Sequence, residues 1–328
     1  MLDDIPAESL FSLLTTVRTA VPPPPAVPTI VSQYSDDGLQ GDISVPHVDF
    51  MSQSHWGDVL ELQGPSGSGK SQILYILLAV CIAPSSLGGW QKAAVLFDTE
   101  GTFESRNFHR VLLSRLVRAA ARLHTWSDEA QLQLLADTAL HKLHVFRPVS
   151  TAQLAASVHN LPAYQKAHMP DADIGLVAID SMSTFYWSDR FSAEQLRPLN
   201  LANTTPLQHV IAALQNFRLS HNPITVLTNW ALTVDNSNGT TAPPLYKQHL
   251  PSFPSLTSTA TPFPLTHHIT LDLTSVPPLH NDPSLTLPTA DNTSKVTGYI
   301  RRPGNSQPAK LMVDIVHTLS HDALHRES

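Results

Sequence analysis

The sequence has one cysteine, few charged side chains and no apolar run long enough to span a membrane. Cys81 has no second cysteine to pair with, so an internal disulfide framework is excluded. Charged residues make up only 14% of the 328 residues, and the formal net charge of −7 argues against a generic nucleic-acid-coating protein. We expect a soluble intracellular protein with Cys81 in its core.

Proline is frequent, with 27 residues, and its positions divide the chain. Residues 1–48 contain the run VPPPPAVP, which cannot continue a helix and acts as a stiff spacer. We therefore predict an N-terminal extension over 1–48 and a core over 49–328. Within that core, residues 231–264 are rich in Ser, Thr, Pro and Asn, which predicts a long insertion of low order.

The stretch GPSGSGKS fits the phosphate-binding pattern G-x-x-x-x-G-K-[ST]. Glycines let successive backbone N–H groups point at phosphate oxygens, and the positive end of a following helix adds to the attraction. The alternation of DVLEL before the stretch indicates a strand, and the apolar run 72–82 after it indicates a helix. This context disfavours the alternative of a plain turn. The residues predicted to bind the nucleotide are Gly64, Pro65, Ser66, Gly67, Ser68, Gly69, Lys70 and Ser71.

Individual roles follow from residue type and position. Lys70 would reach the β- and γ-phosphates, and the Ser71 hydroxyl would hold Mg²⁺. Asp180 ends the apolar run GLVAID, where open α/β sheets bind ligands, and is predicted to hold Mg²⁺ through water. The alternative is a helix N-cap. Glu100, in DTEG, is the candidate base that orients water, with an ordinary acidic loop as the alternative.

Strand and helix patterns alternate along the core, which predicts a mostly parallel sheet with helices on both faces. Three short strands near the end predict an antiparallel extension of that sheet. Expected strands after the loop are 93–99, 144–148, 175–180, 224–230, 267–273, 295–302 and 310–317, and expected helices are 103–123, 128–142, 151–164 and 206–219.

Two patterns leave alternatives open. One face of the 103–123 helix carries arginines, which are either solvated or a surface for DNA or a partner. The aromatic run FYW at 185–187 could stack on bases, but we expect core, since it follows a buried strand. The arginines are Arg110, Arg115, Arg118 and Arg122. The stripe of His317, His321 and His325 has no cysteine or carboxylate pair to complete a metal shell, so we predict no metal site there.

The order of GPSGSGKS, LFDTEGTF, VAIDSMSTFYW and VLTNW resembles the RecA-type recombinases of eukaryotes and their paralogs, over roughly residues 56–230. This resemblance implies a RecA-like P-loop NTPase core that binds ATP and Mg²⁺. It also implies a nuclear protein of homologous recombination and double-strand break repair. Such paralogs form hetero-oligomers with other paralogs, support the strand-exchange recombinase and contact DNA. By this resemblance Lys70 and Ser71 match nucleotide-binding positions, Asp180 the following acid and Glu100 the catalytic glutamate.

Two departures from the family pattern bear on catalysis. Active recombinases have a glutamine after the asparagine of VLTNW, where this chain has Trp230, expected to pack against the sheet or a partner. The 48 residues before the core are also shorter than the family's N-terminal helical domain and linker. The resemblance therefore favours an ATP-holding subunit of a complex, with an independent DNA-stimulated ATPase as the alternative. Whether the chain acts as an enzyme stays open at this point.

Overall fold

The computed structural model describes residues 56–123, 128–196, 206–231, 265–272, 293–302 and 308–316. The predicted extension over 1–48, residues 232–264 of the insertion and the three C-terminal histidines lie outside the described residues. The division of the chain at residue 48 therefore stays a prediction.

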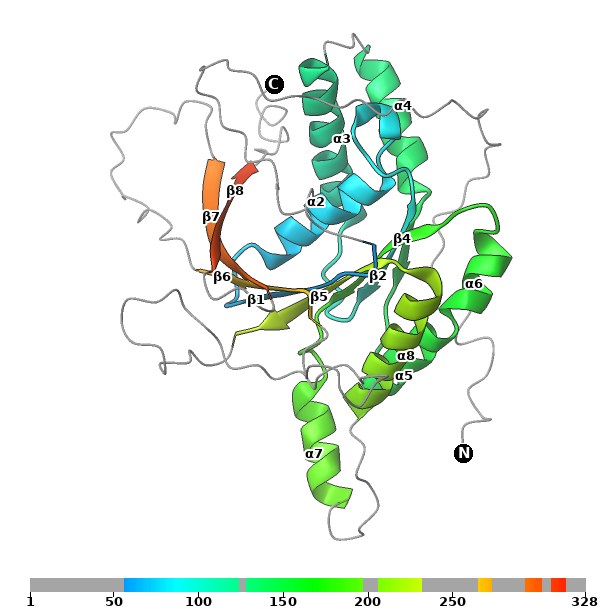
Figure 1. Ribbon diagram of the computed structural model, residues 1–328, viewed down its shortest axis with the longest axis vertical. Coiled ribbons are helices and arrows are strands. Elements are labelled where there is room, and N and C mark those ends of the chain that lie inside the picture. Colours follow the sequence, from blue (N-terminus) through cyan, green and yellow to red (C-terminus); the bar gives the residue numbers. More distant parts are fainter. Residues whose placement is uncertain are drawn as a thin grey trace, which may run out of the picture.

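The described strands form one sheet, which is parallel in its larger part (Figure 1). The strand order is β3-β2-β4-β5-β1-β6-β7-β8, with parallel neighbours from β3 to β6 and antiparallel neighbours from β6 to β8. This confirms the predicted α/β class and the antiparallel strands at its C-terminal end. The strands are β1 Val59–Gly64, β2 Ala93–Asp98, β3 Leu143–Phe146, β4 Ile174–Asp180, β5 Ile224–Trp230, β6 His267–Leu271, β7 Thr293–Arg301 and β8 Ala309–Val316.

β6 is the strand at which the sheet changes from parallel to antiparallel pairing. It pairs in parallel with β1, with Leu60 opposite His267, and antiparallel with β7, so the predicted antiparallel extension begins at the β6–β7 pair. A parallel neighbour needs a long crossover, and the long sequence between β5 and β6 supplies it. β6 also borders the 64–71 loop, because a Cβ on Gly64 would lie 3.1 Å from the Cβ of Leu271.

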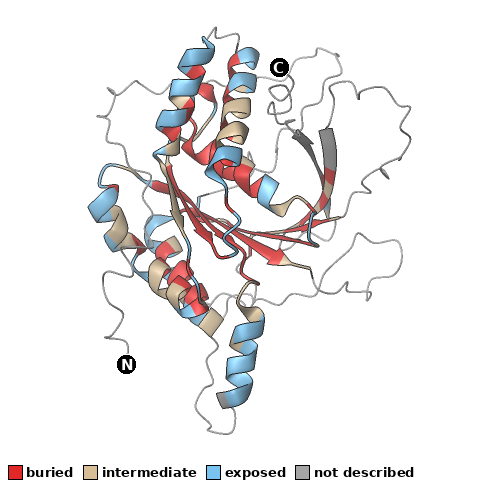
Figure 2. Ribbon diagram, turned by 180° about the vertical axis from the view of Figure 1, so that it is seen from behind, coloured by how far each residue is buried: buried red, intermediate tan, exposed pale blue. Residues whose placement is uncertain are grey.

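Helices cover both faces of the sheet, as predicted, and turn their buried positions toward it (Figure 2). On one face α2, α3 and α4 share a core with the sheet; on the other α5, α6 and α8 do so. None of the described helices has the length and apolar character needed to cross a bilayer. The helices are α2 Lys70–Ile82, α3 Ser105–Arg122, α4 Glu129–Leu140, α5 Thr151–His159, α6 Leu161–His168, α7 Tyr186–Leu196 and α8 Pro206–His221, with a 3₁₀ turn η2 Ser85–Leu87.

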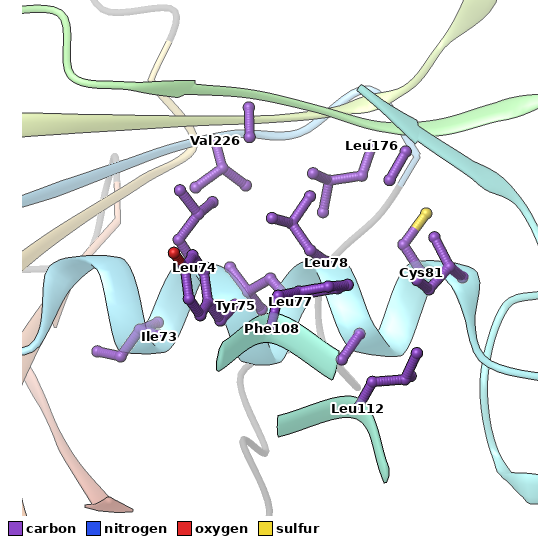
Figure 3. Packing of buried hydrophobic residues seen from close by; sticks show 14 of the residues in the cluster. Ile73, Leu74, Tyr75, Leu77, Leu78, Cys81, Phe108, Leu112, Leu176 and Val226 are labelled. Carbon is purple, nitrogen blue, oxygen red and sulfur yellow. The ribbon is translucent and has the colours of Figure 1, made fainter. Parts of the chain in front are cut away.

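Helix α2 lies between the sheet and α3, and Figure 3 shows this packing. Leu78 faces Leu176 and Val226 of the sheet, and Phe108 of α3 lies on the other side. A fully buried side chain of this size contributes about 1.5–3 kcal/mol. Cys81 is fully buried here, as predicted, and burial raises the pKa of its thiol. Packing on both sides fixes the helix, and with it the position of its N-terminus beside β1.

The helices differ from the prediction in two places. The expected helix over 151–164 is two helices, because α5 ends at His159 and α6 begins with Leu161 followed by Pro162. Proline lacks an N–H and fits the first turn of a new helix. Helix α7 has no counterpart among the predicted elements, and it extends away from the sheet and the other helices (Figure 1).

Candidate nucleotide site

The 64–71 loop connects β1 to α2, and its glycines determine its shape. Gly67 and Gly69 have φ values of 75° and 89°, which L side chains rarely adopt. At Gly64 a Cβ would lie 2.4 Å from Ser68 Oγ, so a larger residue would push the loop open. Gly69 is the N-cap of α2, and no side chain of the described residues caps that end. The first N–H groups of α2 are thus available to an anion.

Lys70 lies over this loop and beside two acids. Its Nζ donates to the carbonyls of Gly64 and Pro65, both at 2.8 Å. Burial lowers the pKa of Lys70, while the charges of Asp180 and Glu100 act in the opposite direction. The ammonium group therefore connects the loop electrostatically to the acids on β4 and after β2.

Ser71 and Asp180 meet, as their predicted roles require. Ser71 Oγ donates to Asp180 Oδ2 at 2.9 Å, and Thr228 of β5 donates to Asp180 Oδ1 at 2.5 Å. Burial raises the pKa of Asp180, and the hydrogen bonds from Thr228 and Ser71 oppose that rise. Thr228 was not among the predicted site residues, and its only local signal is its place at the end of an apolar strand.

These oxygens suit Mg²⁺ better than a metal held by protein ligands alone. Within the described part of the chain no group of three or more His, Cys, Asp or Glu side chains is placed to hold an ion. Mg²⁺ commonly takes one or two protein oxygens together with phosphate oxygens and water. A serine hydroxyl and one carboxylate beside an anion-binding loop fit that pattern.

Glu100 lies in the turn after β2, which is stabilised by hydrogen bonds to the carboxylate of Asp98. Asp98 accepts from the backbone N–H of Thr102 at 3.0 Å and of Phe103 at 3.1 Å. Arg147 Nε lies 3.2 Å from the same carboxylate. Asp98 and Arg147 were not among the predicted site residues. Asp98, at the end of β2, was a local signal for such a turn. Its arginine partner could not be predicted, because Arg147 is distant in the sequence.

Thr99 ties the ends of β2 and β4 together. Its backbone N–H donates to the carbonyl of Asp180 at 2.8 Å, and its Oγ1 donates to the carbonyl of Ser181 at 2.7 Å. The N–H of Ser181 in turn donates to Thr99 Oγ1 at 2.6 Å. These bonds fix the Glu100 turn relative to Asp180.

Trp230 makes a contact that its sequence interpretation did not include. Its indole Nε1 donates to Glu100 Oε1 at 2.7 Å, and its backbone N–H donates to Ser183 Oγ at 2.9 Å. The side chain is half-buried. Trp230 is therefore part of the candidate site and does not only pack against the sheet.

A buried polar row runs beneath the site. Asn229 Nδ2 donates to Glu61 Oε1 at 3.1 Å, and Asn229 Oδ1 accepts from Ser183 Oγ. His268 Nε2 lies 3.7 Å from Glu61 Oε2. Burial first and the charge of Arg301 second lower the pKa of His268 to about 4. The row joins β1, β5 and β6 behind the residues that face the loop.

The aromatic run after β4 is not core throughout. Trp187 and Phe191 of α7 are 57% and 63% exposed, so the preference for core is wrong at Trp187. Phe185 and Tyr186 are half-buried. The aromatic run alone does not predict that the residues after β4 form a helix that extends away from the sheet.

The fold and the similarity to RAD51 define a RecA-like α/β core, with the 64–71 loop, Asp180 and Glu100 at the carboxyl ends of parallel strands. No family model matches the chain. The named relatives to which it is similar confirm the resemblance to eukaryotic RecA-type recombinases and their paralogs.

Three relatives illustrate this similarity. The mouse DNA repair protein XRCC2 is 35% identical over 136 residues, which cover 42% of this chain and 44% of the relative. The human DNA repair protein RAD51 homolog 2 is 25% identical over 39% of this chain and 30% of the relative. The budding yeast DNA repair protein RAD51 is 26% identical over 53% of this chain and 37% of the relative. The chain thus spans half or less of the length of these relatives.

Proposed function

We propose that this chain is an ATP-binding, XRCC2-like recombinase paralog that acts in homologous recombination and double-strand break repair. The observation that carries the proposal is the meeting of Lys70, Ser71 and Asp180 at the end of β1 and β4. The similarity to relatives named as DNA repair proteins supports the biological role.

Each site residue has a part in holding the nucleotide. The 64–71 backbone and the N-terminal end of α2 would receive the phosphates, with Lys70 leaving its loop carbonyls to reach the β- and γ-phosphates. Ser71 and Asp180 would hold Mg²⁺, Asp180 through water. The bound ion neutralises phosphate charge and orients the γ-phosphate. Burial raises the pKa of Asp180 and so disfavours its carboxylate form. A bound cation would favour that charged form again.

The chain would work as one subunit of a nuclear complex with other RecA-type paralogs, in which it contacts DNA. In RecA-like assemblies ATP lies between neighbours, so a partner would complete the site. The proposed organisation is an extension over 1–48 followed by the ATPase core over 49–328.

The second candidate function is an independently active, DNA-stimulated ATPase. One observation favours it: Glu100 stands at the end of β2, and its charge reaches Lys70. The same glutamate is engaged by Trp230, which favours the ATP-holding subunit instead.

Co-expression with the other recombinase paralogs of the same organism tests the proposal. We expect the full chain to co-purify with at least one of them and to bind a fluorescent ATP analogue in the presence of Mg²⁺. Lys70→Ala should keep folding and lose the nucleotide. A chain that binds neither a paralog nor ATP would contradict the proposal, and fast ATP turnover by the chain alone with DNA would favour the second candidate.

A further inference from the structure

The Trp230–Glu100 contact points to a control on hydrolysis, an inference that rests on the proposed ATP-binding function. We propose that Trp230 is a positioning residue that holds the Glu100 carboxylate away from the attacking water, so that the chain retains bound ATP instead of cleaving it. We call this pair the Trp230–Glu100 latch.

The latch spans the site from one side to the other. Glu100 follows β2 and Trp230 ends β5, while β4, which ends at Asp180, lies between these two strands. Trp230 also stands opposite Gly64 in the pairing of β5 with β1, and the carbonyl of Gly64 accepts from Lys70. The hydrogen bond of 2.7 Å therefore links the carboxyl ends of β2 and β5, which lie on either side of the strand that ends at Asp180.

The tryptophan is the fixed half of the latch. Its backbone N–H donates to Ser183 Oγ, and Ser183 is bonded in turn to Asn229. Glu100 is exposed, and among the described residues the indole is the one hydrogen-bond donor to its carboxylate. The next residue, Gly101, has a φ of 69° and open space around it. The contact therefore restrains Glu100 and not Trp230.

The chemistry of an indole makes this restraint inhibitory. An indole N–H only donates, so it takes up a lone pair of Oε1 and can neither accept a proton nor orient water through an acceptor. In hydrolysis a water proton passes to the Glu100 carboxylate, the water oxygen bonds to the γ-phosphorus, and ADP leaves with the former bridging oxygen. The Glu100 side chain must leave the indole before either carboxylate oxygen can reach that water, while Trp230 keeps its own proton throughout.

Trp230→Phe in the full chain tests the latch, because it removes the N–H and keeps an aromatic ring. Affinity for a fluorescent ATP analogue with Mg²⁺ should stay within about twofold of the parent chain. Phosphate release should rise roughly tenfold, which corresponds to about 1.4 kcal/mol. Glu100→Gln added to this variant should abolish the gain.

Tryptophan fluorescence supplies a readout that does not depend on turnover. The difference between parent and Trp230→Phe spectra isolates Trp230 among the five tryptophans of the chain. The same difference spectrum is then recorded in the Glu100→Ala background, without nucleotide. The emission of Trp230 should shift, because Glu100→Ala removes the acceptor of the indole N–H. The exposed Trp187→Phe serves as the matched control, whose own difference spectrum should not respond to Glu100→Ala.

The outcomes separate the latch from the function on which it rests. If the parent chain binds ATP and Trp230→Phe releases phosphate no faster than the parent, the latch is overturned and ATP binding stands. If the parent chain binds no ATP, the proposed function and the latch both fail. Melting curves check folding, and if Trp230→Phe does not fold, Trp230→Leu, which also lacks a hydrogen-bond donor, takes its place with the same expected gain.

Discussion

Lys70 connects the two halves of the candidate site, since its Nζ contacts the carbonyls of Gly64 and Pro65 and feels the charges of both acids. Lys70→Ala removes this cation and leaves the glycines of the loop in place. It should weaken ATP binding at least about tenfold, a loss of roughly 1.4 kcal/mol. Titration with a fluorescent ATP analogue measures the change. Lys166→Ala, at an exposed position of α6, is the matched control, and an unchanged affinity in a folded Lys70 variant would contradict the assignment.

Asn229 stabilises the fold through a buried acid. Its Nδ2 donates to the carboxylate of Glu61, which is fully buried. Asn229→Ala removes that donor, and the loss should lower the free energy of unfolding by about 1–3 kcal/mol. Urea unfolding measures it, with the exposed Asn216→Ala of α8 expected to change stability by less than about 0.5 kcal/mol. Equal stabilities of the two variants would count against a supporting role for the buried row.

Residue by residue, the site was predictable as far as its signals are local. The spacing of GPSGSGKS placed Lys70 and Ser71, and an acid at the end of an apolar strand placed Asp180. The Trp230–Glu100 bond was not predictable, because it joins residues 130 positions apart across an intervening strand. Such contacts depend on how far side chains extend across neighbouring strands. The spacing of apolar residues in the sequence carries no information on that distance.

At the level of elements, hydrophobic period and apolar runs located most strands and helices. The differences arise where tertiary context decides. β6 pairs in parallel with β1 because it lies beside that strand in the sheet. The aromatic run suggested buried core, whereas α7 is a helix with exposed aromatic side chains. A strand's partner and a helix's exposure are properties of the assembled sheet.

Two histidines in different strands make the fold sensitive to acid. Burial, with His168 as the second cause, lowers the pKa of His144 in β3 to about 4. Burial and Arg301 lower the pKa of His268 in β6 to about 4. An unfolded histidine titrates near about 6.5, so the unfolded chain binds more protons between about pH 6.5 and pH 4. These two histidines therefore lower the free energy of unfolding as the pH falls through this window.

His144→Gln tests that expectation. The variant cannot take up a proton, yet its amide can still reach the Tyr164 hydroxyl that lies 3.1 Å from His144 Nδ1. Stability measured by urea unfolding from pH 7 to pH 4.5 should then fall less steeply than in the parent chain. His209→Gln, at an exposed position of α8, should keep the parent slope. Parallel slopes in all three proteins would remove His144 as a cause.

For the whole molecule, the distribution of cations bears on the proposed contact with DNA. The net charge is −7, and the segment 231–264 contains one lysine, Lys247, and no arginine. On α7 the exposed Trp187 and Phe191 flank Arg190, but Arg190 Nε lies 3.1 Å from Glu194. Exposed aromatics can stack on bases, yet a paired arginine offers little to phosphates. These cations therefore favour the proposal that any tight contact with DNA is made within a complex and not by this chain alone.

We accordingly expect weak single-stranded DNA binding by the isolated chain. With so few cations in the two segments that follow β4 and β5, the chain alone should neutralise only about two or three phosphates, each of which contributes a slope near −0.7 in log affinity against log salt. Fluorescence anisotropy at several salt concentrations measures that slope. A slope steeper than about −4, or nanomolar affinity at physiological salt, would reveal a basic surface elsewhere. The arginine face of α3 is then the surface to test, because Arg118 and Arg122 are exposed there. Burial, followed by the charges of Arg122 and Arg118, lowers the pKa of the neighbouring Arg115. The double variant Arg118→Ala/Arg122→Ala would reduce a steep slope if α3 were that surface, and would leave the expected shallow slope unchanged if it is not.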